Sequence, residues 1–257
     1  MKSTAFIIHL GRAAARRRQV EKIRAALPVP AEILAATDGA ALGASERKAV
    51  LSEDPLFAPP YPFALGPGEI GCFLSHRRAW KAIVERGLDA ALIIEDDVEI
   101  STAVFSEAFR LAARHVGRLG YVQFQTRPLS GRGRVIDTAG EARLVVPEVA
   151  PLRTSAQLVS RAAAKRLLEC SERIDRPVDC FLQLRWVTGI APAVVEPSGV
   201  ADRTAEAGGS TISRRRRLPE RLRHEILRPI YRWRIARASR RAAASPSAPG
   251  GGSTAPR

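Results

Sequence analysis

Cysteine is scarce in this chain of 257 residues, and the three that occur, Cys72, Cys170 and Cys180, are widely scattered. Their number and spacing exclude a disulfide framework and the paired cysteines of a structural zinc site. This usage is typical of a protein in a reducing compartment. We therefore expect a cytoplasmic location.

Long apolar runs are also missing, although hydrophobic residues make up 46% of the chain, enough for a sizeable core. No run approaches the roughly 20 apolar residues of a transmembrane helix. The apolar patch at residues 5–8 is too short for the core of a signal peptide, and we interpret it as a first strand.

Positive charge is concentrated near the carboxyl end. The net charge is +15, and residues 214–241 hold 12 arginines against only Glu220 and Glu225, a net +10 that leaves +5 for the rest. We divide the chain into a body at 1–213, a basic amphipathic helical tail at 214–241 and a disordered tail at 242–257. The last of these is rich in alanine, serine, proline and glycine.

The most informative stretch is residues 91–97, where the apolar run Ala-Leu-Ile-Ile ends in Glu95, Asp96 and Asp97. The pattern predicts a buried strand with carboxylates where it leaves the sheet. Adjacent carboxylates repel one another unless a cation neutralises them, and their oxygens suit Mg²⁺ or Mn²⁺. A solvated turn is the simpler alternative, but three acids in a row favour a cation site.

The amino-terminal third predicts an α/β domain. A strand at 5–10, an amphipathic helix at 13–27 and a strand at 32–36 form a strand–helix–strand unit. A further helix is expected at 72–86, just before the acidic strand.

These segments together resemble glycosyltransferase family 25, which contains lipooligosaccharide galactosyltransferases and is related to collagen galactosyltransferases. The family hallmark is Gly-Glu-Ile-Gly-Cys-x-x-Ser-His, a tryptophan, and an apolar strand ending in Glu-Asp-Asp. It is present here at 68–76, Trp80 and 93–98. The amino-terminal Ile-Asn-Leu-x-Arg-x-x-x-Arg occurs at 8–16, with His9 in place of the usual Asn. Further similar segments are Thr-Asp-Gly at 37–39, the strand and helix at 156–168, Pro-Val-Asp at 177–179 and Ser-Thr-Ile at 210–212.

The resemblance covers roughly residues 5–213 and leaves the basic tail outside. It implies a GT-A-like single domain that binds a nucleotide sugar, built on a mixed, mostly parallel sheet. It also implies transfer of a hexose, usually galactose, from a UDP-sugar to a saccharide acceptor such as lipooligosaccharide or another cell-surface glycan.

Under this interpretation the acidic motif holds Mn²⁺ or Mg²⁺ against the diphosphate leaving group. Asp97 is the predicted metal ligand. Glu95 would contact the ribose or sugar hydroxyls or reach the metal through water, and Asp96 could point to either side, because neighbouring residues on an extended segment face opposite ways.

Four further residues are candidate donor contacts. Arg12 and Arg16 could bind the diphosphate, because arginine suits phosphate oxygens, although solvated charge on a helix would also explain them. Asp38 could contact uridine or ribose, or simply form an Asp-Gly turn. His76 could contact the diphosphate or metal, or be a core residue on the apolar face of its helix.

Inverting transfer also needs a base for the acceptor hydroxyl. Asp179 is the leading candidate and Glu69 the second. Each has a structural alternative, Asp179 as a helix cap and Glu69 as an acid favoured by the helix dipole in a first turn.

The basic tail has three explanations: an anionic membrane surface, non-specific contact with nucleic acid, or solubility. Tyr231 and Trp233 among the arginines favour the membrane, so we expect a protein peripheral to the inner face of the cytoplasmic membrane, with a lipid-linked saccharide acceptor and no specific nucleic acid. Two alternative functions remain: an Mg-dependent phosphatase or phosphoacceptor domain, and a non-catalytic protein that binds anionic surfaces or nucleic acid. A phosphatase usually carries its acids after the first strand, which here ends in His9 instead.

Overall fold

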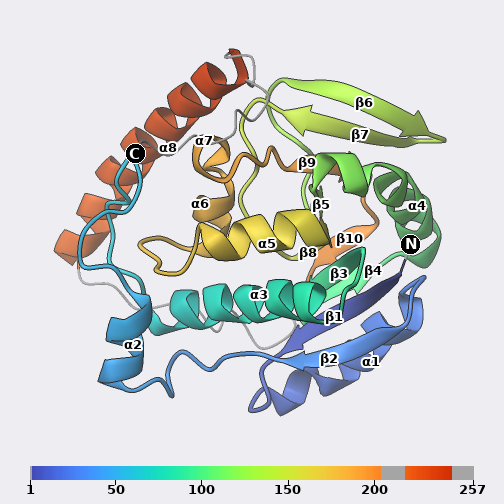
Figure 1. Ribbon diagram of the computed structural model, residues 1–257, viewed down its shortest axis with the longest axis horizontal. Coiled ribbons are helices and arrows are strands. Elements are labelled where there is room, and N and C mark those ends of the chain that lie inside the picture. The colour runs from blue at the N-terminus through green and yellow to red at the C-terminus, as the bar shows by residue number, and fades with distance from the viewer. Residues whose placement is uncertain (1, 204–217, 245–257) are drawn as a thin grey trace, which may run out of the picture.

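The structure, a computed structural model, describes residues 2–203 and 218–244, with the side chains of 218–222 outside that description. The Ser-Thr-Ile motif at 210–212 and residues 245–257 of the predicted disordered tail also lie outside it. Within the described residues, an eight-stranded sheet carries helices on both faces (Figure 1).

The central sheet has the strand order β2-β1-β3-β8-β5-β9-β7-β6. Strands β8 and β7 run against all the others, so the sheet is mixed and most of its strands point the same way. This confirms the predicted α/β class and the mixed, mostly parallel sheet. A separate ribbon pairs β10 with β4. The strands span Ser3–His9 (β1), Ala31–Ala35 (β2), Ala90–Glu95 (β3), Val98–Ile100 (β4), Tyr121–Phe124 (β5), Gly133–Ala139 (β6), Ala142–Pro147 (β7), Ala156–Ser160 (β8), Ala193–Glu196 (β9) and Val200–Asp202 (β10).

Two hydrophobic clusters cover the two faces of this sheet. Strand residues alternate between them, so Ile7 and Ile94 pack with α1 and α4, while Phe6 and Ile93 pack with α3, α5, α6 and α8. The helices span Ala14–Arg16 (η1, a 3₁₀ turn), Arg17–Ala26 (α1), Ala44–Val50 (α2), Pro67–Glu85 (α3), Thr102–Leu119 (α4), Arg161–Glu169 (α5), Val178–Leu182 (α6), Arg185–Thr188 (α7) and Leu218–Ala244 (α8).

Helix α3 begins at Pro67, earlier than the predicted helix at 72–86. Proline is favoured at the first helical position because its missing N–H would have no partner there. Glu69 Oε2 then accepts a 2.7 Å hydrogen bond from the Gly66 N–H, which is the acidic half of a capping box, since glycine has no side chain to supply the other half. The whole Gly-Glu-Ile-Gly-Cys motif is therefore helical.

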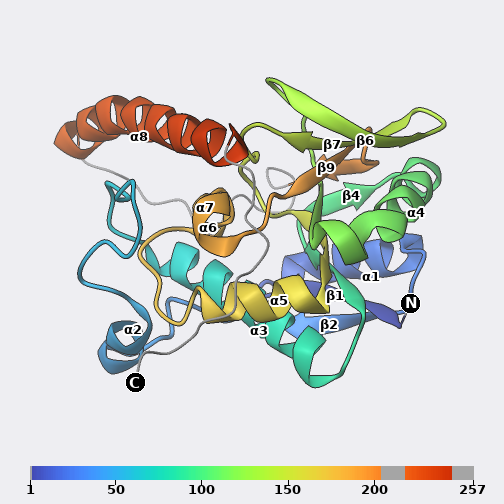
Figure 2. The same cartoon turned by 45° about the horizontal axis from the view of Figure 1, so that its top comes forward.

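Helix α8 contains residues 218–241 of the predicted basic tail and 242–244 of the tail predicted to be disordered. It packs against the body, on the side of the molecule away from β2 and α1 (Figures 1 and 2). Residues 214–217 lie outside the described ranges. The helix continues across Pro229. Tyr231, Ile235 and Ser239, spaced four residues apart, are buried against the body. Of the helices in the described ranges, none combines the length and hydropathy of a membrane span.

Candidate active site

The acidic segment lies at the carboxyl end of β3, beside the carboxyl end of β1. These strands are parallel, and Ile8 pairs with Glu95 across them, so His9 and Asp96 follow at neighbouring positions. Asp96 is only 5% exposed. Asp96 lines only the first of the two cavities that meet here, whereas Glu95 and Asp97 line both. Residues 96 and 97 form a turn after β3, and this turn buries Asp96 while its two neighbours reach both cavities.

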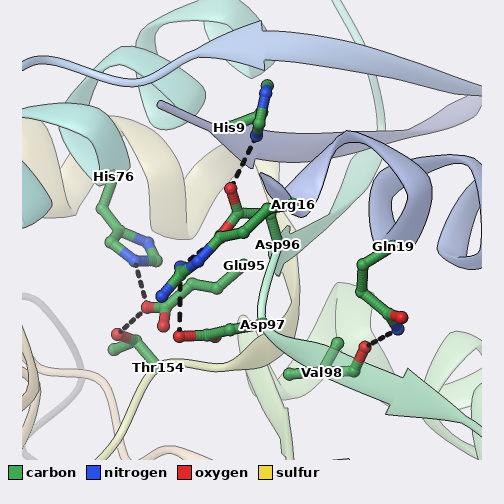
Figure 3. Close-up of polar contacts among 9 residues, drawn as sticks. All are labelled: His9, Arg16, Gln19, His76, Glu95, Asp96, Asp97, Val98 and Thr154. Atoms are coloured by element: carbon green, nitrogen blue, oxygen red, sulfur yellow. Dashed lines mark hydrogen bonds and ion pairs between the residues drawn. The ribbon is translucent and has the colours of Figure 1, made fainter. Parts of the chain in front are cut away.

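Asp96 is held by two basic side chains (Figure 3). His9 Nδ1 lies 2.6 Å from its Oδ2, and Arg16 Nη1 donates to its Oδ1 at 2.7 Å. The same Arg16 nitrogen lies 3.3 Å from Asp97 Oδ2. Arg16 is itself buried, so one guanidinium offsets charge on two adjacent carboxylates away from water.

Glu95 faces the other side, toward α3 and the start of β8. Its Oε1 lies 3.2 Å from His76 Nε2 and accepts from Thr154 Oγ1 at 2.8 Å. Gln157 Nε2 lies 3.0 Å from His76 Nδ1, so its amide N–H donates there and places the ring proton on Nε2, facing Glu95. Burial alone would raise the pKa of Glu95, but His76, Thr154 and Arg16 outweigh it and lower that pKa. Glu95 is therefore ionised at neutral pH.

The site offers two sets of atoms that suit a cation. Glu95 and Asp97 supply carboxylate oxygens at a shared cavity wall, which fits Mg²⁺ or Mn²⁺. Cys72, His76 and Glu95 form a second group whose ligand atoms lie within 4.8 Å of one another, a mixture of sulfur, nitrogen and oxygen that suits softer metals. The chemistry of the oxygen donors fits the expected metal.

The first cavity, of about 110 Å³, lies at the carboxyl edge of the sheet. Arg12 and Asp38 face each other across its mouth, with Arg12 Nε 2.5 Å from Asp38 Oδ2. The hydrogen bond from Arg12 lowers the pKa of Asp38. Both side chains reach solvent, so the pair can open to a ligand at small cost.

Two glycines bring the Thr-Asp-Gly turn onto the start of α3. A Cβ at Gly39 would lie 1.8 Å from Pro67 O, and one at Gly71 would lie 2.5 Å from Thr37 O. The Thr37 N–H donates to Ser75 Oγ at 2.8 Å, and that hydroxyl donates to Gly71 O at 2.6 Å. The two motifs thus fix each other, and Asp38 is held at the same cavity as His76.

The second cavity, of about 550 Å³, adjoins the first and contains both candidate bases. Asp179 accepts from the N–H groups of Arg153, at 3.2 Å, and Cys180, at 2.8 Å. Burial, the largest influence, and the charge of Glu95 raise the pKa of Asp179 despite these bonds. Glu69 lines the same cavity and caps α3.

Helix α8 forms part of the wall of this second cavity. Tyr231 packs edge-on against Tyr61, with ring centroids 5.3 Å apart, and its hydroxyl is 3.2 Å from Nη1 of the fully buried Arg176. His224 stacks on Phe63 at a centroid distance of 3.7 Å. These contacts hold α8 against the loop that contains Tyr61 and Phe63.

The predicted site residues thus fall into two groups. The first cavity is lined by Arg12, Arg16, Asp38, His76, Glu95, Asp96 and Asp97, and the second by Glu69, Glu95, Asp97 and Asp179. The two cavities share Cys72, Glu95 and Asp97.

Sequence reasoning missed three residues that position the site: His9 and Thr154, which contact its carboxylates, and Gln157, which contacts His76. His9 carried a signal, because a polar residue at the end of a buried strand needs a partner nearby. Thr154 and Gln157 lie some 60 residues beyond the acidic motif, and only the antiparallel pairing of β3 with β8 brings them to it.

Comparison with known proteins points to one protein family. Residues 2–126 match the model of glycosyltransferase family 25, described as an LPS biosynthesis protein. Procollagen galactosyltransferase 1 of Danio rerio is 40% identical over 95 residues, 36% of this chain and 16% of that protein. A glycosyltransferase 25 family member of Drosophila melanogaster is 31% identical over 190 residues, 70% of this chain and 30% of that protein. A mouse relative, named inactive glycosyltransferase 25 family member 3, is 32% identical over 193 residues, 70% of this chain and 31% of that protein.

The chain therefore spans less than a third of the length of these curated relatives. Among solved structures, a glycosyltransferase involved in glycosylation of the major capsid of PBCV-1 aligns over 66% of this chain and 65% of its own, with a TM-score of 0.35 and 11% identity. Mannose-1-phosphate geranyltransferase from Thermus thermophilus aligns over 76% and 74%, with a TM-score of 0.38 and 10% identity.

Proposed function

Residues 2–126 belong to glycosyltransferase family 25, and from this premise we propose that the protein transfers a hexose from a UDP-sugar to a saccharide acceptor. The observation that carries the proposal is the junction of two cavities at Glu95 and Asp97. A donor in the first cavity and an acceptor in the second would meet at these carboxylates. A single-substrate hydrolase would need only one such cavity.

The first cavity has the chemistry of a donor site. Arg12 can turn from Asp38 to a phosphate oxygen, which leaves Asp38 to accept from a ribose or uracil group. Arg16 stays with Asp96 and Asp97, so in this proposal it orients the acidic motif. Mn²⁺ or Mg²⁺ bound by Asp97 and Glu95 would offset charge on the diphosphate leaving group.

The acceptor hydroxyl needs a base on the other side of the sugar. Asp179 suits that role because its raised pKa makes it a stronger base than an exposed aspartate, while its two backbone hydrogen bonds fix its position. Glu69 is the second candidate and already serves as a helix cap. Direct attack with Asp179 as base would give inversion at the sugar.

Galactose is the proposed hexose, because two of the similar proteins are named procollagen galactosyltransferases. The family description refers to LPS biosynthesis, which supports a lipooligosaccharide or another cell-surface glycan as acceptor. Such an acceptor would be lipid-linked at the cytoplasmic face of a membrane.

Helix α8 supports peripheral contact with that membrane. Ile226, Ile230 and Trp233 are 55%, 42% and 58% exposed. Their spacing of four and three residues places them on one stripe, opposite the buried Tyr231 and Ile235. Arginines flank the stripe, a combination that suits an anionic lipid surface.

The direct test is release of UDP from a panel of UDP-sugars by the full chain, with and without Mn²⁺ or Mg²⁺, and with a phosphomonoester as an added substrate. We expect metal-dependent turnover of UDP-galactose and none of the phosphomonoester. Absence of both UDP binding and turnover would reject the proposal and place the chain with its inactive relative. Turnover of the phosphomonoester alone would favour the phosphatase alternative.

A further inference from the structure

Two arginines of α8, Arg228 and Arg232, line the second cavity together with Asp97 and Asp179. They are four residues apart, so they occupy the same side of the helix, one turn from each other. Both are exposed at the cavity wall, and the family match ends a hundred residues before them.

The carboxylates of this cavity are engaged elsewhere. Asp97 interacts with Arg16, Asp179 accepts two backbone N–H groups, and Asp202 pairs with Arg153. Glu69 accepts from the Gly66 N–H, and Glu95 accepts from Thr154. Within the described part of the chain, no carboxylate pairs with Arg228 or Arg232. Two guanidinium groups one turn apart repel each other, and an anion between them removes that repulsion.

The packing of α8 against the body fixes the position of these two arginines. Tyr231, between them in sequence, is 6% exposed and hydrogen-bonds the buried Arg176, while Ile235 is 1% exposed in the core. On the other side of the pair, His224 stacks on Phe63, so the anchored helix orders both arginines at less entropic cost than a free tail does. The arginines therefore belong to the cavity.

We infer that this cavity accepts a saccharide bearing a negative charge, a phosphate or carboxylate group, which Arg228 and Arg232 recognise while Asp179 faces its hydroxyl. The inference rests on the proposed function for the direction of transfer. The anion binds on the acceptor side, because these arginines line only the second cavity, whereas the donor contacts Arg12 and Asp38 line only the first. Arginine suits both anions through paired N–H donors.

The test compares binding of glucose, glucose 6-phosphate and glucuronate to the full chain by ligand-observed NMR. The variant is Arg228→Gln with Arg232→Gln. The control is Arg234→Gln with Arg237→Gln, which removes the same charge from the same helix at residues that line a different cavity. The affinity for UDP is measured in parallel for every protein.

The wild type should bind one or both charged sugars at least about tenfold more tightly than glucose. The Arg228/Arg232 variant should lose that advantage and keep its UDP affinity, while the control should keep both. Glucose 6-phosphate alone would identify phosphate as the anion, and glucuronate alone would identify carboxylate.

Equal binding of glucose and both charged sugars by the wild type would overturn the inference. So would a loss in the control variant as large as in the cavity variant, which would show a diffuse charge effect. A loss of UDP affinity in the Arg228/Arg232 variant would reassign the arginines to the donor. If the proposed function is wrong, a separate result shows it: the wild type neither binds UDP nor turns over a UDP-sugar.

Discussion

His9 Nδ1 lies 2.6 Å from Asp96 Oδ2, and Arg16 holds the other oxygen of the same carboxylate at 2.7 Å. All three side chains are less than a tenth exposed. The central acid of the motif is thus part of the framework that places its two neighbours at the cavities.

Replacing Asp96 by alanine should therefore destabilise the fold, by about 1–3 kcal/mol, because the buried His9 and Arg16 lose their shared carboxylate while Arg16 keeps its contact with Asp97. His9→Asn should cost less than about 1.5 kcal/mol, because an amide can still donate to Asp96. Urea unfolding curves measure both. Asp54→Ala, at an exposed site, is the control, and an equal cost for Asp96→Ala and Asp54→Ala would contradict the framework role.

The close backbone contacts at Gly39 and Gly71 predict a second effect. Gly39→Ala or Gly71→Ala forces a Cβ into backbone atoms, so each should cost about 1–3 kcal/mol and loosen the donor cavity. Gly117→Ala, at an exposed position of α4 with open space around it, should instead stabilise by about 0.5–1 kcal/mol. Thermal unfolding with and without UDP measures stability and donor binding together. Tolerance of alanine at Gly39 would refute the packing argument.

The proposed role of Asp97 as a metal ligand gives a third prediction. Asp97→Asn keeps the shape of the side chain but removes its charge, so UDP-galactose turnover should fall by at least about 100-fold while the thermal unfolding midpoint changes little. Asp137→Asn, on β6 away from both cavities, removes a comparable charge and should retain activity. Full turnover by Asp97→Asn with unchanged metal dependence would remove Asp97 from the metal site.

The raised pKa of Asp179 predicts the pH dependence of turnover. A base must be ionised, so kcat/KM should fall as the pH drops through the pKa of Asp179, at a higher pH than an ordinary exposed aspartate would give. Glu95 has a lowered pKa and stays ionised over that range. Asp179→Asn should lose about 10²–10⁴-fold and abolish this acid limb, whereas Glu69→Gln should retain it. Loss of the limb in Glu69→Gln alone would transfer the role to Glu69.

The exposed stripe of α8 predicts membrane behaviour. Ile226→Ser with Trp233→Ser should reduce co-sedimentation with vesicles of anionic lipid by about tenfold, since two large apolar side chains no longer enter the interface. Turnover on a water-soluble acceptor should be unaffected. Leu56→Ser, another exposed apolar site, serves as the control. Vesicle binding that survives the double change would count against the stripe.

Local signals predicted much of the body. The strand at 91–94 and the first strand were expected because their apolar runs are short, buried and bounded by polar residues. The second strand, β2, was expected from its apolar run as well, and it is only partly buried. Strand β6 was missed because most of its residues are exposed, so it carries little alternation. The ribbon of β4 and β10 was missed because each strand has three residues and their pairing spans a hundred positions.

The same limit on prediction from local sequence signals applies to the candidate site. Alternation along an extended segment was expected to divide the three acids, but residues 96 and 97 form a turn. The contacts of Asp96 with His9 and Arg16 account for its being the buried one. Arg16 was expected to contact a ligand, yet its charge also has a carboxylate partner in the protein, which only the parallel pairing of β1 and β3 supplies. The position of α8 had no local signal beyond its apolar spacing.

The bond between Tyr231 and Arg176 sets a practical boundary for the molecule. Arg176 is fully buried in the body, and one of its guanidinium nitrogens is hydrogen-bonded to a hydroxyl contributed from 55 residues further along the chain. A fragment cut before α8 would expose the Ile235 site and remove one of that nitrogen's two acceptors, leaving its 3.2 Å hydrogen bond to Pro59 O. The smallest piece worth expressing therefore runs at least to Ser239, whose hydroxyl closes the far end of the helix on Glu148 O at 2.6 Å.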